Sequence, residues 1–225
     1  MSTNMLAIDL INVDIPLLKP TDTVGQALVW MQDNRLEQLI LADEHSYLGI
    51  IDENTLLNYD DECTLEHVPS LFPQVQIQSH QHIYEIANVL SLHEEAKIIG
   101  VVENDQLIGC ITAESIFRHF ALLLGAQEQG AILEIAIKER DYSLSEITRL
   151  IESNQVKVLS AYLSGSMYTL EKPLTLFVKL NQTDIGATVA TLERFGYMVQ
   201  SAYANEPVES VDQQRFDLLM KYLNM

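Results

Sequence analysis

Basic residues are scarce in this sequence. Of its 225 residues, 13 are Lys or Arg and 32 are Asp or Glu, so the formal net charge at pH 7 is −19. Nucleic acids and anionic membrane surfaces are both bound through clustered lysines and arginines. The composition therefore disfavours both of these partner classes.

Cysteines and long apolar runs are also lacking. The two cysteines, Cys63 and Cys110, give neither a disulfide framework nor a metal-ligand spacing. No uninterrupted apolar run approaches the roughly 18 to 20 residues needed to cross a bilayer, and the N-terminal stretch MSTNMLAIDLINVDI has no basic region ahead of its apolar residues. Because 48% of the residues are apolar, proper cores are still possible. We therefore expect a globular, cytoplasmic protein with two reduced thiols.

Catalytic motifs are missing as well. The sequence has no Ser-His-Asp order, Walker loop, pair of catalytic carboxylates or G-x-G-x-x-G. His80 and His82 could ligate a metal, as in a hydrolase, but no Asp, Glu or Cys cluster of recognisable spacing accompanies them. We interpret them as solvated loop histidines, and Trp30 as a core or interface residue rather than a base-stacking one. The sequence therefore predicts a protein that is not an enzyme.

A repeat of about 60 residues is the main pattern that is present. Residues 49–55 read GIIDENT and residues 109–115 read GCITAES. Each glycine lies in the second of two short apolar strands, which are QLILA and YLGII in the first copy and KIIGVV and LIGCI in the second. Each strand pair follows a helix with apolar residues at i, i+3, i+4 and i+7: Val24, Ala27, Leu28 and Met31, then Ile83, Ile86, Ala87 and Leu90. Each repeat is thus predicted to be helix, strand, strand, short helix, with Thr21 or Asp22 capping the first helix.

Two such repeats should form one domain. A single repeat leaves an apolar sheet face uncovered, so two copies should pack around a pseudo-twofold axis. The charge marks where this domain ends, because residues 1–125 carry a net charge of −15 and residues 126–225 carry only −4. We predict a domain over 1–125, with repeats at about 8–60 and 66–124.

The second half of the chain has a different order of elements. AILEIAI, VKVLSAYL, LTLFVKL and YMVQSAY are typical of strands, Ser143 and Glu146 predict a capping box at the start of one helix, and a second helix is expected over 184–195. The resulting order, β-α-β-β-α-β, is the ferredoxin-like signature. We predict this domain over 130–204, followed by a helical tail over 205–225 that docks on it. The whole chain is then an α+β protein.

These patterns resemble two known families. On its repeated glycine turns, the region of about 8–124 resembles a tandem pair of cystathionine-β-synthase (CBS) domains, with two α-β-β-α repeats. On its element order, the region of about 130–204 resembles an ACT domain. The combination resembles the CBS-ACT regulatory proteins of the acetoin-utilisation type. The resemblance implies a non-catalytic, regulatory homodimer that binds a small-molecule effector.

The CBS resemblance implies a ligand site at the second turn. In binding members the turn reads Gly, two apolar residues, Thr or Ser, two further residues and Asp, and it binds adenosine-containing ligands such as AMP. The hydroxyl contacts the phosphate and the Asp accepts hydrogen bonds from the ribose. Gly109 and Thr112 match this pattern, Ser115 replaces the Asp, and Arg118 and Lys97 are the nearest cations in sequence.

The first turn departs further from the pattern. It keeps Gly49 but has Asp52 at the hydroxyl position and Thr55 at the acidic position. Because a carboxylate repels a phosphate, we expect any nucleotide to bind at the second turn, as a monophosphate or a nucleoside.

Two alternatives remain open. The ACT resemblance implies amino-acid binding where the first strand meets the first helix, but Tyr142 and Asp141 stand where the family has glycine and often proline. An ACT sheet can instead serve side-by-side dimerisation. The protein could also be an adaptor dimer with degenerate pockets, whose acidic surface meets a basic partner.

Overall fold

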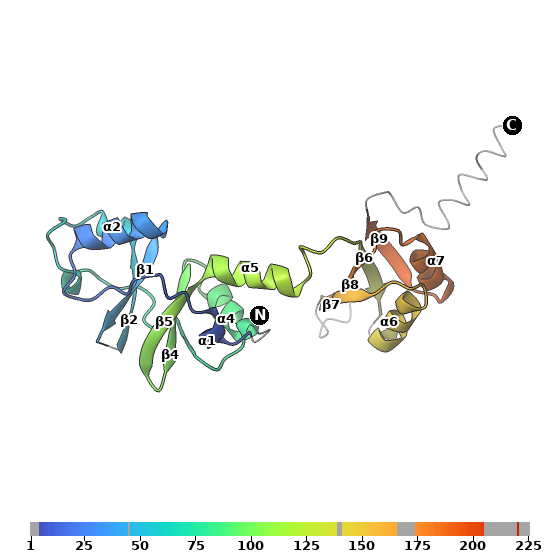
Figure 1. Ribbon diagram of the computed structural model, residues 1–225, viewed down its shortest axis with the longest axis horizontal. Coiled ribbons are helices and arrows are strands. Elements are labelled where there is room, and N and C mark those ends of the chain that lie inside the picture. The colour runs from blue at the N-terminus through green and yellow to red at the C-terminus, as the bar shows by residue number, and fades with distance from the viewer. Residues whose placement is uncertain (1–4, 45, 139–140, 166–173, 205–219, 221–225) are drawn as a thin grey trace. The chain divides into compact units, whose positions relative to one another are not determined.

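The structure is a computed structural model that describes residues 5–44, 46–138, 141–165, 174–204 and 220 (Figure 1). The chain divides into two compact units, Met1–His119 and Phe120–Met225. Both units combine helices with antiparallel strands, so the α+β class is confirmed.

The N-terminal unit contains the predicted helix-strand-strand-helix order twice. The first copy consists of α2 (Val24–Asn34), β1 (Gln38–Asp43), β2 (Ser46–Asp52) and α3 (Glu53–Leu56). The second consists of α4 (Ile83–Leu92), β4 (Ile98–Glu103), β5 (Gln106–Thr112) and α5 (Ala113–Leu123), a helix that continues past the end of this unit at His119. The last helices differ in length, since α3 is a single turn of 4 residues whereas α5 has 11. The expectation of a short helix after each turn is therefore wrong for the second copy.

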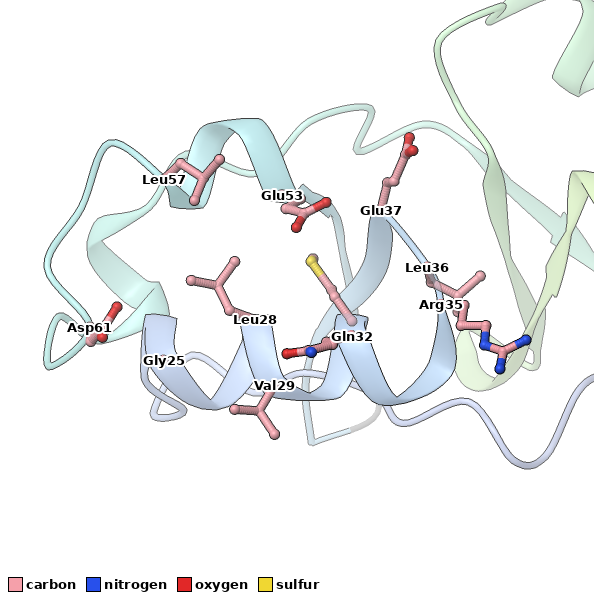
Figure 2. Close-up of a pocket in the computed structure, with 11 residues that line it drawn as sticks. Gly25, Leu28, Val29, Gln32, Arg35, Leu36, Glu37, Glu53, Leu57 and Asp61 are labelled. Carbon is pink, nitrogen blue, oxygen red and sulfur yellow. The ribbon is translucent and has the colours of Figure 1, made fainter.

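The first helix of each copy, α2 or α4, packs its apolar stripe inward. Val24, Ala27 and Met31 on α2 are buried, as are Ile83 and Ile86 on α4. The predicted stripes are thus confirmed as buried at these five positions, whereas Leu28, Ala87 and Leu90 are half-buried. Figure 2 shows Leu28 in the space between α2 and α3.

The N-cap of α2 is Thr23, so the prediction of Thr21 or Asp22 is wrong. The Thr23 hydroxyl accepts a hydrogen bond from the Gln26 N–H, and the Gln26 side chain accepts one from the Thr23 N–H, which is a complete capping box. The Asp22 carboxylate instead accepts a hydrogen bond from the Lys19 N–H, 2.7 Å away. It therefore stabilises the turn that precedes the helix.

Three further elements of the N-terminal unit were not predicted, namely α1 (Ala7–Leu10), the 3₁₀ helix η1 (Leu65–His67) and β3 (Gln76–Gln78). β3 pairs in parallel with β4 and makes a three-stranded sheet. In the first copy the equivalent pairing is a single parallel bridge from Leu18 to Leu41. Equivalent strands also contact each other, β1 with β4 and β2 with β5, as a pseudo-twofold arrangement requires.

The C-terminal unit has the predicted β-α-β-β-α-β order. Its elements are β6 (Ile132–Ile137), α6 (Leu144–Glu152), β7 (Val158–Ser164), β8 (Leu174–Leu180), α7 (Gly186–Arg194) and β9 (Met198–Tyr203). The strands form an antiparallel sheet in the order β7-β8-β6-β9. Alternate residues of β6 and β8 form one core cluster with α6 and α7, so both helices cover the same face of this sheet. The predicted docking of residues 205–225 lies outside the described residues, apart from Met220.

Candidate functional site

The two glycines of the repeated turn occupy equivalent irregular positions in their hairpins. The register shifts between Leu41 and Ala42 opposite Gly49, and between Val101 and Val102 opposite Gly109. The glycine φ angles are +139° and +158°. Such backbone favours glycine, so the repeat of this residue has a conformational cause.

Chain segments also pass close to both glycines. A Cβ added to Gly109 would lie 2.5 Å from Cγ2 of Ile11, and one added to Gly49 would lie 2.7 Å from the carbonyl oxygen of Leu71. The neighbouring Asn12 N–H donates to the carbonyl of Cys110. Both glycines therefore make room for another segment of the protein's own chain, a side chain at Gly109 and a backbone carbonyl at Gly49, and their presence is not by itself evidence for a ligand.

The second turn joins Thr112 and Ser115 at the start of α5. The Thr112 Oγ1 accepts a hydrogen bond from the Ser115 N–H at 3.1 Å, and both residues are half-buried. A threonine hydroxyl that accepts one hydrogen bond still has its own proton to donate. Thr112 can thus cap the helix and contact an anion at the same time.

The cations expected near the second turn are each engaged with a carboxylate. Arg118 lies on the exposed surface of α5 and pairs with Glu114 at 2.7 Å, one helical turn away. Lys97 pairs with Glu37, and the hydrogen bond to Glu37 raises the pKa of Lys97. Neither charge is brought to Thr112 by a described contact.

In the first turn, Asp52 contacts Gln38, whose side chain is hydrogen-bonded to the other repeat. The Asp52 Oδ1 accepts from the Asn54 N–H at 2.9 Å, which caps α3, and Oδ2 accepts from Nε2 of Gln38 at 3.1 Å. Gln38 is 4% exposed, and its amide also donates to the Glu95 carbonyl and accepts from the Lys97 N–H. Both oxygens of Asp52 therefore have protein donors, and the carboxylate has no proton with which to bind a phosphate.

Gln38 was not among the residues singled out from the sequence. The sequence did contain a signal for it, because Gln38 is the one polar residue in the otherwise apolar stretch QLILA. Thr55, at the acidic position of the first turn, is half-buried on α3. It has no carboxylate to offer a ribose.

A pocket of about 630 Å³ lies in the C-terminal unit where β6 leads toward α6. Its polar lining includes Lys138, Asp141 and Glu146, and its apolar lining includes Phe195 and Met198. Tyr142, which stands where the ACT pattern has glycine, is 39% exposed and does not line it. Residues 139 and 140, in the same connection, lie outside the described residues.

The predicted capping box of α6 is only half correct. The Ser143 hydroxyl accepts from the Glu146 N–H at 3.4 Å, but Oε2 of Glu146 accepts from the Tyr197 hydroxyl at 2.8 Å. Burial and this hydrogen bond raise the pKa of Tyr197 to about 12. The carboxylate thus joins α6 to the start of β9 at the pocket wall.

The residues considered for other chemistry have structural contacts. His82 caps α4 by accepting from the Tyr84 N–H at 3.4 Å, and its ring stacks on Tyr84. Trp30 is half-buried on α2. Within residues 5–44, 46–138, 141–165 and 174–204, no group of three or more His, Cys, Asp or Glu side chains could hold a metal ion. Among the helices that the structure describes, none is long and apolar enough to cross a membrane.

Comparison with known proteins finds CBS domain pairs. No family model matches the sequence. A CBS domain pair/ACT domain protein from Thermotoga maritima is 20% identical with a TM-score of 0.49, and the match covers 53% of this chain and 99% of that one. A putative acetoin utilization protein from Vibrio cholerae is 22% identical with a TM-score of 0.47, over 55% and 96% of the two chains. CBSX2 in complex with AMP is 16% identical with a TM-score of 0.44, over 53% and 98%.

Proposed function

We propose that this protein is a non-catalytic regulatory module that senses an adenosine-containing metabolite at the second glycine turn. The observation that carries the proposal is the Thr112 hydroxyl at the first turn of α5, which accepts from the Ser115 N–H and retains a proton to donate. The N-terminal end of a helix favours an anion. A phosphate next to Thr112 would meet both features.

The charge of the N-terminal unit limits the size of the ligand. Residues 1–125 carry a net charge of −15, and Lys97 and Arg118 already pair with Glu37 and Glu114. A triphosphate without a metal would meet a strongly repulsive field. We therefore expect AMP or a nucleoside to bind better than ATP.

Ser115 makes this a weak site. An Asp at its position would accept charge-assisted hydrogen bonds from the two ribose hydroxyls, and a Ser offers one neutral oxygen. The missing contact costs on the order of 1.5–3 kcal/mol, which corresponds to roughly a ten- to hundredfold loss of affinity. The expected dissociation constant is correspondingly high, so the ligand must be tested at millimolar concentration.

A thermal-shift screen tests the proposal. The full chain is heated with AMP, ADP, ATP, S-adenosylmethionine, NAD or free adenosine, and with amino acids in separate wells. Because a ligand that binds only the folded state stabilises it by an amount that grows with the ratio of ligand concentration to dissociation constant, AMP should raise the melting temperature more than the same concentration of ATP does. No shift with any adenosine-containing compound, confirmed by calorimetry, would refute the nucleotide proposal.

Amino-acid sensing in the C-terminal unit is the second candidate. It is supported by the 630 Å³ pocket, in which Lys138, Asp141 and Glu146 provide charges of both signs beside the apolar Phe195 and Met198. A zwitterion with an apolar side chain suits such a lining. A stabilising amino acid whose effect is lost in Lys138→Ala, and kept in Lys157→Ala as a surface control, would favour this candidate.

We also expect a homodimer, since the CBS and ACT patterns both resemble modules that bury apolar surface across a twofold axis. Light scattering at micromolar concentration should give twice the 25.4 kDa of one chain. If the protein is a monomer and binds no ligand, both the sensor hypothesis and the adaptor-dimer hypothesis are refuted.

A further inference from the structure

The sheet of the C-terminal unit has one face that α6 and α7 do not cover. Alternate residues of β6 and β8, such as Leu133 and Leu176, belong to the core cluster with these two helices. Because side chains alternate along a strand, the residues between them lie on the opposite face. Across the strands they form three rows: Ser160, Lys179, Ile132 and Tyr203; Tyr162, Phe177, Glu134 and Ser201; and Ser164, Thr175, Ala136 and Met198. We call these rows the open face of the sheet.

Large apolar side chains gather on the open face. Ile132, Tyr162 and Tyr203 are 37%, 46% and 57% exposed. The rings of Tyr162 and Phe177 stack with their centroids 4.9 Å apart, and Glu134 is the next residue of their row. Burying apolar side chains such as these is favourable, and a continuous exposed patch of them usually marks a contact surface. The open face therefore favours a further element that covers it.

One corner of the open face is already in contact with the chain that leads into β6. The Ser160 hydroxyl donates to the carbonyl of Leu124 at 2.8 Å, and Nζ of Lys179 donates to the carbonyl of Gly130 at 3.0 Å. These contacts engage the polar end of the first row. Its apolar end, with Ile132 and Tyr203, lies on the other two strands. The covering element is thus needed from the middle of the sheet to the β9 edge.

The C-terminal tail, residues 205–225, follows directly at that edge, because β9 ends at Tyr203. Apart from Met220, which is helical and 41% exposed, the tail lies outside the described residues. In its sequence, Ser210 and Gln213 have the spacing of a capping box. The residues after them have apolar side chains at i, i+3, i+4 and i+7: Phe216, Leu219, Met220 and Leu223. The sequence therefore predicts a helix with one apolar stripe.

The length of the tail matches the width of the open face. A helix over residues 210–225 would be about 24 Å long. The outer strands of a four-stranded sheet lie about 14 Å apart. Residues 205–209 can span about 16 Å, which is enough to lead from the β9 edge onto the face. Pro207 disfavours a continuation of β9 as a paired strand. The tail can therefore turn back and cross the sheet.

We propose that residues 210–225 form an amphipathic helix that covers the open face of the sheet in its own chain. Charge favours this occupant, because Glu134 lies near the middle of the face and Arg215 lies one helical turn before Leu219, at the border of the apolar stripe. A second copy of the face would instead bring Glu134 toward its own counterpart. A tethered segment also has an effective concentration on the order of millimolar, which favours it over a separate chain.

Amide hydrogen exchange of the full chain tests the proposal. A short helix is marginally stable in isolation, so slow exchange in the tail reports that it is docked. The reference is a synthetic peptide of residues 208–225, and the amides of α6 report whether the domain itself stays folded. Tyr162→Ser alters the open face. Tyr142→Ser makes the same change at a tyrosine that is 39% exposed and lies outside that face.

A charge exchange tests the predicted ion pair. Glu134→Arg and Arg215→Glu each remove the attraction between tail and sheet, and the double variant restores it with the charges reversed. Lys221→Glu is the control, because Lys221 falls on the side of the predicted helix away from the apolar stripe.

We expect the tail amides of the wild type to exchange at least about tenfold more slowly than those of the peptide. Tyr162→Ser should bring them close to the peptide while α6 stays protected, and Tyr142→Ser should leave them unchanged. If Tyr162→Ser loosens α6, Tyr203→Ser makes the same test in another row. Each single charge change should speed tail exchange by about threefold, and the double variant should return it to the wild-type rate.

Three results would overturn the proposal. Tail amides that exchange in the wild type as fast as in the peptide would mean that the tail is not docked. Protection that neither Tyr162→Ser nor Tyr203→Ser reduces would mean that the tail covers another surface. Protection that is lost on dilution would mean that it covers a second copy of this chain.

Discussion

The two glycine turns begin alike and end in different chemistry. Both have a glycine at a register shift of a hairpin, followed three residues later by an oxygen-bearing side chain that caps the next helix. In the second turn this side chain is a hydroxyl that can also donate. In the first it is the Asp52 carboxylate, whose oxygens accept from Asn54 and Gln38. The fold requires the cap in both places, and only the second copy leaves a group that suits a phosphate.

The comparison also shows what each turn contributes to stability. Through Gln38, the first turn is linked to the backbone of Glu95 and Lys97 in the other repeat. The described side-chain hydrogen bond of Thr112 stays within its own turn. We infer that the first turn serves chiefly to join the repeats and that the second has become the one available for a ligand.

The largest expected effects come from the glycines. Gly49→Ala should lower the free energy of unfolding by about 3 kcal/mol, because its Cβ would meet a backbone oxygen at 2.7 Å. Gly109→Ala should cost about 1–2 kcal/mol, since its Cβ would meet the side chain of Ile11, which can rotate away. Denaturant unfolding of both variants measures the difference. Equal losses would mean that the two close approaches are equally rigid.

The next largest loss of stability is expected when Gln38 is replaced. Gln38→Leu removes the amide that serves Asp52, the Glu95 carbonyl and the Lys97 N–H, and leaves them without this partner at a buried position. The expected loss is about 2–3 kcal/mol, against less than about 0.5 kcal/mol for the exposed Gln106→Leu. Thermal and denaturant melts decide this. If Gln38→Leu melts like the wild type, the network does not join the repeats.

Part of this fold could be predicted from the sequence because its signals are local. The apolar spacing of Val24, Ala27 and Met31 and the alternation in AILEIAI depend on neighbouring residues, and the helix and strand they predict are present. β3 was missed because three residues are too few to show a period and its pairing is with β4, a distant segment. The partners of the Gln38 side chain at Glu95 and Lys97 are 57 and 59 positions away, so no local pattern indicates them.

The candidate site was less predictable than the fold. The spacing of Gly109, Thr112 and Ser115 gave the turn, and Thr112 and Ser115 do lie in contact. The pairing of Arg118 with Glu114 follows an i, i+4 spacing that was visible in the sequence and was not used. That Asp52 is held by Gln38 depended on tertiary contact between β1 and β2 and could not be inferred from either stretch alone.

A smaller effect should follow from restoring the acidic residue of the second turn. Ser115→Asp supplies the carboxylate for the ribose hydroxyls, so AMP affinity should rise by roughly 1–2 kcal/mol. Thr55→Asp, the matched change in the first turn, should alter it by less than about twofold, because the Asp52 carboxylate would still repel a phosphate there. Calorimetry with AMP compares the two variants. An equal gain in AMP affinity from both variants would contradict the claim that only the second turn suits a phosphate.

The most direct measurement gives the second turn the chemistry of the first. Thr112→Asp keeps an oxygen that can accept from the Ser115 N–H, so α5 should stay capped and the melting temperature should hardly change. The carboxylate cannot donate and repels phosphate, so AMP binding by calorimetry should fall below detection while adenosine without a phosphate is affected less. AMP binding that survives Thr112→Asp unchanged would contradict the assignment of the phosphate to this hydroxyl.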